Sequence, residues 1–279
     1  MKKEIVRNTD YQKEERPETR FKQFFDIFFH RFVELLKLSL LQAVFNMPLI
    51  VSLVLFHQLV RSSTSMGSLM TVFLIQGGSL LISMPSVFVG LTGVFYCFKK
   101  IIHSDGEYAS SSFFIGMREE WKNGLLIGLI AGFSFALTVI GCFYFYYYVP
   151  SFNTVIAGFG IAILVIQSLI VLMVCYYSIG QVVFYKNPLR FVLKNSFIMT
   201  LIRFPINLLL TIIHPGILVA LFVIMDITMY VGIVLLIFLV GIGHLIWNLN
   251  VISAFDKYIN KENYKDIYLK GLSTYNKEE

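Results

Sequence analysis

Five polar side chains lie inside otherwise apolar runs of this sequence and are its first candidates for chemistry. They are His214, His244, Gln167, Asn46 and Gln76. A polar side chain in a hydrocarbon environment is costly, so such residues often mark a substrate or ion path. The alternative is structural, because hydrogen bonds between neighbouring helices use the same residue types at about 0.6 kcal/mol each.

The two histidines form the most specific pair. His214 lies ten residues after Phe204, about 15 Å into its apolar run at 1.5 Å per residue. His244 lies seven residues before Val251, about 10 Å from the same side. Since the two runs follow each other in the chain, we expect antiparallel helices with the imidazoles facing each other at similar depth. These runs contain no carboxylate, which favours a structural role over a proton relay.

Catalytic templates are incomplete. Glu119–Glu120, together with His244 and Asn248, approximates the paired glutamates and His-x3-Asn of an intramembrane prenyl-protein protease. That template needs an arginine where this chain has Gly124. Ser134 is not followed by the final glycine of a nucleophile elbow, and the sequence contains no P-loop or HExxH motif. We therefore expect a protein that is not an enzyme and needs no cofactor and no metal.

The composition indicates a membrane protein. Of 279 residues, 57% are hydrophobic and 14% are charged, whereas soluble domains carry about 25% charged residues. The mean hydropathy is +0.72. The three cysteines lie in apolar runs without CxxC spacing, which is typical of small buried hydrophobic residues.

Six apolar runs exceed the roughly 20 residues that a helix needs to cross a ~30 Å hydrocarbon core. The sequence therefore predicts an all-α, polytopic transmembrane helical bundle of about six spans. The second run is long enough to be either one kinked span or two pieces. The runs are 35–60, 68–98, 125–149, 155–184, 204–225 and 231–251.

Basic residues alternate between the connectors. Of the 23 lysines and arginines, 22 fall on one set of connectors and only Arg61 falls on the other. The positive-inside rule then places both termini in the cytoplasm of a protein of the cell membrane, and the net charge of +6 needs no nucleic-acid partner. We expect a disordered cytoplasmic tail over 1–20, one membrane-embedded domain over 21–255 and a cytoplasmic tail over 256–279.

Three amphipathic stretches precede the first, third and fifth runs on the predicted cytoplasmic side. They cover 21–32, 113–121 and 189–201, and we expect interfacial helices there. Their aromatic and basic residues either form a docking surface for anionic lipid or a soluble partner, or serve topology alone. The docking candidates are Phe113, Trp121, Arg118, Lys122 and Phe191.

One stretch resembles a known family. It reads Pro85-x4-Gly90-Leu91-Thr92-Gly93-x2-Tyr96, then a basic exit, a short polar loop and Phe113–Phe114. An aromatic-basic entry segment and a first run with Asn46 and Pro48 complete the pattern over roughly 21–148. This resembles the YesL-like family of bacterial integral membrane proteins, whose members often accompany carbohydrate uptake systems. The resemblance implies an accessory role near sugar import and supplies no catalytic residues.

Two functions follow as hypotheses. The first is a non-enzymatic accessory or regulatory component associated with carbohydrate uptake, with the lipid bilayer and a membrane permease or other transport component as partners. The second is a small transporter or channel with a polar path through the bundle, lined by the five polar residues above.

Overall fold

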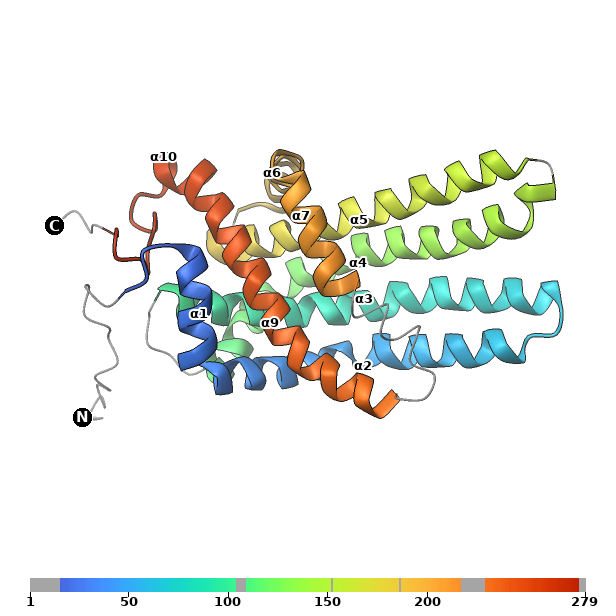
Figure 1. The fold of residues 1–279 in the computed structure, drawn as a ribbon, viewed down its shortest axis with the longest axis horizontal. Helices are drawn as coiled ribbons and strands as arrows, with labels where there is room; N and C mark the ends of the chain where they lie inside the picture. Colours follow the sequence, from blue (N-terminus) through green and yellow to red (C-terminus); the bar gives the residue numbers. More distant parts are fainter. Residues whose placement is uncertain (1–15, 104–108, 152, 186, 217–228, 276–279) are drawn as a thin grey trace.

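The computed structural model describes residues 16–275, except 104–108, 152, 186 and 217–228. The described chain is helical and holds no strand, as the sequence predicts. Its main feature is a layer of four long antiparallel helices, each packed against the next in sequence (Figure 1). They are α2 (Phe32–Ser62), α3 (Met66–His103), α4 (Ala109–Tyr147) and α5 (Thr154–Tyr185).

These four helices are the ones long and apolar enough to cross a membrane among the described residues. They coincide with the first four predicted runs, and the 68–98 run is one helix rather than two pieces. In α5, only 11% of the apolar window is buried inside the protein. The exposed side chains there are apolar, which is the surface that lipid tails accept and water does not.

The last two predicted runs differ from the first four. Helix α6 (Leu189–Ile202) meets α7 (Phe204–Thr211) at a bend of 94°. The π-helix η3 (Ile212–Gly216) continues α7, so the described part of the 204–225 run is about 20 Å long at 1.5 Å per residue. Its remainder lies outside the described residues. Counting the bent pair as one span gives up to five candidate spans among the described residues, whereas the sequence predicts about six in the whole chain.

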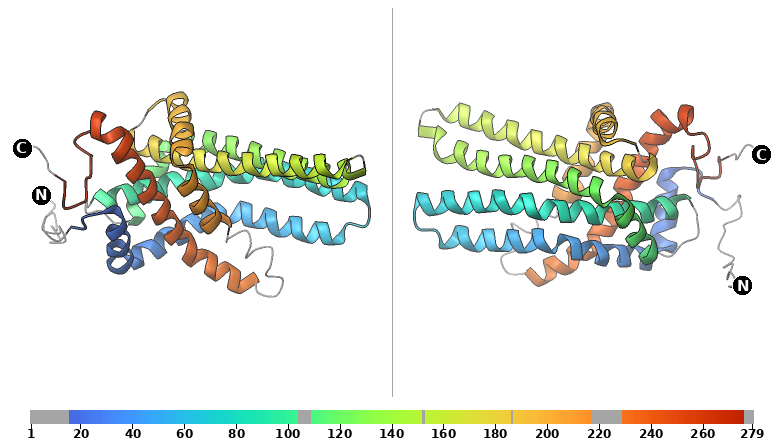
Figure 2. Two further views of the ribbon diagram at one scale, coloured as in Figure 1. Left: turned by 45° about the horizontal axis from the view of Figure 1, so that its top comes forward. Right: turned by 180° about the vertical axis from the view of Figure 1, so that it is seen from behind.

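Helix α9 (Met229–Phe255) coincides with the sixth predicted run. It crosses one face of the layer obliquely and packs on α2, α3 and α5 (Figures 1 and 2). The core lies under this crossing, where large side chains from α3, α5 and α9 are fully buried. Among them are Phe88, Phe95, Phe98, Tyr177, Trp247 and Phe255.

The amphipathic stretches have different outcomes. The first and third stretches are helices, as predicted: α1 (Arg20–His30) and α6. Residues 113–121 are helical, but they form the first part of the continuous helix α4 and not a separate helix. No proline separates this stretch from the following run, and Gly116 lets α4 lie directly against the Tyr96 ring of α3.

The two ends of the described chain pack together. The backbone N–H of Ser273 donates to the carbonyl of Pro17 at 3.1 Å. After α9, the chain forms η4 (Asp256–Asn260) and α10 (Lys261–Asn263) and then folds back beside α1. Thr19 caps α1 by accepting a hydrogen bond from the Lys22 amide. The predicted disordered tail falls largely on 1–15, outside the described residues.

Candidate functional site

The structure places the two predicted histidines side by side. The ring centroids of His214, on η3, and His244, on α9, are 5.1 Å apart, with the rings inclined at 75°. A side chain at Gly243 would overlap the His214 ring, so this glycine makes the close approach possible. Neither nitrogen of His214 nor Nδ1 of His244 has a hydrogen-bond partner among the described residues. Ring packing therefore joins the pair.

The amide residues of the spans make local bonds between neighbours. Gln167 of α5 donates to Ser134 Oγ of α4 at 2.9 Å. The Ser52 hydroxyl of α2 donates to Gln76 Oε1 of α3 at 3.1 Å. Asn46 instead accepts from Gln42, one turn earlier in α2, at 2.9 Å.

The predicted path-lining residues therefore lie at four separate places. Gln76 joins α2 to α3, Gln167 joins α4 to α5, and the histidines join η3 to α9. The Gln76 and Gln167 contacts match the structural interpretation, in which hydrogen bonds hold adjacent helices together. Asn46 bonds within α2, and the two histidines contact each other only through their rings among the described residues.

A second buried polar cluster was not predicted. Asn207 Oδ1 of α7 accepts hydrogen bonds from the Tyr177 hydroxyl of α5 and from Asn250 Nδ2 of α9, both at 3.0 Å. The signal in the sequence that could have indicated this cluster was an asparagine inside each of the last two apolar runs, Asn207 and Asn250. Only the fold shows that Tyr177 meets both of them.

The docking candidates divide into buried and exposed residues. Phe113 is wrong as a docking residue, because its side chain is 0% exposed. It packs beside Phe45 and over Gly93, where any β-carbon would lie 2.7 Å from the Phe113 carbonyl oxygen. Trp121 of α4 and Phe191 of α6 are 47% and 62% exposed.

The basic docking candidates lie on the exposed side of α4. Arg118 and Lys122 are both exposed, and the Lys122 ammonium lies 5.8 Å from the centre of the Trp121 ring. Such a cation–π contact orients an aromatic ring at a surface without removing it from solvent. An aromatic and basic surface made of Arg118, Trp121 and Lys122 therefore exists on α4.

A buried polar chain anchors the C-terminal segment. Arg20 of α1 donates to Asp256 Oδ2 at 2.7 Å and 3.2 Å, and Asp256 Oδ1 accepts from Asn260 at 2.9 Å. Asn260 Oδ1 in turn accepts from the Tyr185 hydroxyl at the end of α5. Burial lowers the pKa of Arg20, and the Asp256 carboxylate opposes that shift.

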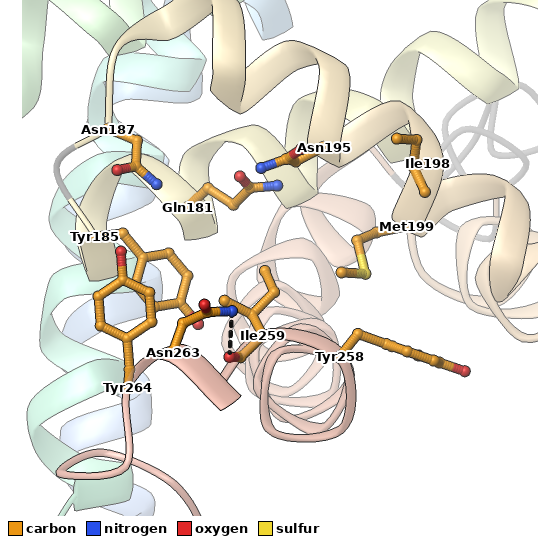
Figure 3. Close-up of a pocket in the computed structure, with 10 residues that line it drawn as sticks. All are labelled: Gln181, Tyr185, Asn187, Asn195, Ile198, Met199, Tyr258, Ile259, Asn263 and Tyr264. Atoms are coloured by element: carbon orange, nitrogen blue, oxygen red, sulfur yellow. Dashed lines mark hydrogen bonds between the residues drawn. The ribbon is translucent and has the colours of Figure 1, made fainter. Parts of the chain in front are cut away.

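A cavity of about 560 Å³ lies beside this row of hydrogen-bonded side chains. It opens between α5 and α6 on one side and η4 and α10 on the other (Figure 3). Its size falls within the range of small-molecule sites. Side-chain amides and tyrosines dominate its lining, which is made of Gln181, Tyr185, Asn187, Asn195, Ile198, Met199, Tyr258, Ile259, Asn263 and Tyr264.

The cavity could not be found in the sequence, because its walls come from segments about 70 residues apart. Nothing in the local pattern around Asn195 or Asn263 indicates that they face each other.

The described residues contain no group of three or more histidine, cysteine or acidic side chains that could hold a metal ion. The three cysteines carry no disulfide, and Cys97 and Cys175 are buried. No family model, no curated protein and no solved structure matches this chain.

Proposed function

We propose that this chain is a non-enzymatic, multi-pass protein of the cell membrane that acts as an accessory component of carbohydrate uptake. The YesL-like resemblance over roughly 21–148 supports the association with sugar import. The distribution of basic residues supports an orientation with both termini in the cytoplasm. The partner would be a membrane permease, bound at the exposed aromatic and basic surface of α4.

One observation carries this proposal. Gln76 and Gln167 are used in hydrogen bonds between neighbouring helices, whereas the side chains of Trp121 and Phe191 are exposed. Tryptophan and arginine are among the residue types that are enriched in interface hot spots.

Co-purification tests the proposal. The full chain is extracted in mild detergent, and captured carbohydrate permease is quantified by mass spectrometry. Truncating a hot-spot tryptophan costs about 2 kcal/mol, roughly thirtyfold in affinity, so Trp121→Ala should lose most of the permease. Phe133→Ala is the matched control, since Phe133 is 59% exposed on the apolar part of the same helix. Equal permease recovery with Trp121→Ala and wild type would contradict the proposal.

The second candidate is a small transporter or channel, and the histidine pair favours it. Three of the four imidazole nitrogens have no partner among the described residues, so they could contact a passing solute. Under the accessory proposal, proteoliposomes with His214→Phe or His244→Phe should swell in maltose or potassium chloride as wild-type ones do. Loss of a wild-type flux in a folded variant would instead support transport.

A further inference from the structure

We propose that the cavity between α5–α6 and the C-terminal segment binds a small, uncharged molecule rich in hydroxyl groups, of the size of a mono- or disaccharide. This inference goes beyond the accessory role and does not depend on it. The cavity and the α4 docking surface have no residue in common.

The first argument is unused hydrogen-bonding capacity. Gln181 is fully buried at the cavity, and its Nε2 donates to Ser196 Oγ at 3.0 Å. Its Oε1 has no partner among the described residues. Buried polar atoms in folded proteins are almost always hydrogen-bonded, so this oxygen would accept a hydrogen bond from a water molecule or from a ligand hydroxyl.

Two further amides face the same space (Figure 3). The side chains of Asn187 and Asn195 line the cavity, and no hydrogen bond joins either of them to another described residue. An amide both donates and accepts hydrogen bonds, as a hydroxyl group does. Amides from α5, from α6 and from the connection between them therefore offer matched contacts to a polyhydroxyl ligand.

The second argument is charge. None of the described residues that line the cavity is charged. The nearest buried carboxylate, Asp256, is already paired with Arg20 and bonded to Asn260. An ionised ligand would lose hydration without gaining a partner there, which is costly. An uncharged ligand avoids that cost.

The third argument is the shape of the wall. The rings of Tyr185 and Tyr264 stack on each other, with centroids 4.7 Å apart and planes inclined at 32°, and they form an aromatic wall at one side of the cavity. The Tyr185 hydroxyl is bonded to Asn260, which fixes that ring. Flat aromatic faces accept the C–H groups of a sugar ring, while its hydroxyls reach the amides.

Equilibrium dialysis of the full chain tests the proposal. The chain is placed in lipid nanodiscs, because maltoside detergents present the ligand chemistry under test. The radiolabelled probes are maltose, glucose and sorbitol, with gluconate as a charged counterpart. Asn195→Leu keeps the side-chain size and removes both hydrogen-bonding groups. Asn123→Leu is the matched control, since Asn123 lies on α4 and bonds only to Glu120 in the described chain.

At least one uncharged probe should bind saturably. Gluconate should bind at least about tenfold more weakly than that probe. Asn195→Leu should weaken that binding about tenfold, while Asn123→Leu and Trp121→Ala leave it unchanged. The proposal is overturned if no uncharged probe binds saturably, if gluconate binds equally well, or if Asn195→Leu binds like wild type. None of these results bears on permease capture, so the two proposals fail separately.

Discussion

Arg20 and Asp256 form a buried ion pair between the two ends of the described chain. Their side chains are 10% and 6% exposed. The carboxylate is also bonded to Asn260 Nδ2 and to the backbone N–H of Leu269. Because one pair holds α1, η4 and the following segment, it determines how the cavity wall is positioned.

Removing one partner of this pair should be strongly destabilising. Arg20→Met leaves the Asp256 carboxylate buried without a cation, which typically costs about 3–5 kcal/mol. The double variant Arg20→Met/Asp256→Leu should recover most of that loss. Thermal unfolding in detergent measures both.

Lys22→Met is the control for this prediction, because Lys22 and Glu18 form an ion pair that is exposed on both sides. Its unfolding midpoint should match wild type. A midpoint for Arg20→Met that also matches wild type would show that the pair is not buried in solution.

At the residue scale, the sequence predicted how far along its helix a side chain lies, but not which side chains of a helix enter the core. Counting residues along two apolar runs was enough to bring His214 and His244 together. Phe113 and Phe114 are adjacent in the predicted amphipathic stretch 113–121, yet Phe113 is buried and Phe114 is 44% exposed. Room made by Gly93 on α3 decides which of the two adjacent rings enters the core, and that is a tertiary property.

The contact between α3 and α4 depends on three glycines spaced four apart. Gly124, Gly128 and Gly132 lie on one side of α4, and a β-carbon on each would approach α3 backbone to between 2.5 and 3.1 Å. Small residues at this spacing let two helix backbones come close together in membranes. This stripe is visible in the sequence and is absent from our sequence-based predictions.

Adding one methyl group to this contact should separate the helices. A β-carbon on Gly128 would lie 2.5 Å from Pro85 Cα, and backbone cannot move aside as a flexible side chain can. We expect Gly128→Ala to lower the free energy of unfolding by about 1–3 kcal/mol. Measurements in detergent by thermal or denaturant unfolding give the value.

Gly78→Ala is the matched control, because nothing lies within 4 Å of its β-carbon position. It should be neutral or should stabilise α3 by up to about 1 kcal/mol, since alanine favours helix more than glycine. Equal destabilisation by both substitutions would rule out close α3–α4 packing as the cause.

At the scale of helices, the sequence predicted which segments are helical better than it predicted the directions in which those helices run. Hydropathy identified α2 to α5 because their apolar runs are long. It could not show that α6 and α7 meet at 94°, since both are apolar. Pro205 at the start of α7 and the bond from Arg203 to the Asn250 carbonyl, at 2.9 Å, fix that corner.

At the scale of the whole molecule, the described chain has two different ends. One end holds both described chain ends, the C-terminal segment and the cavity (Figures 1 and 2). The other consists of the short connections between α2 and α3 and between α4 and α5. Basic residues concentrate at the first end, and we therefore propose that this end lies in the cytoplasm.

Cysteine labelling in intact cells tests this orientation most directly. In a background with Cys97, Cys142 and Cys175 replaced by serine or alanine, single cysteines are introduced as Thr64→Cys, between α2 and α3, and as Thr274→Cys, near the C-terminus. Both positions are described, and Thr274 is exposed. A membrane-impermeant maleimide should label position 64 in intact cells and position 274 only after the cells are opened. Labelling of position 274 in intact cells, with position 64 protected, would show the opposite orientation and contradict the proposed one.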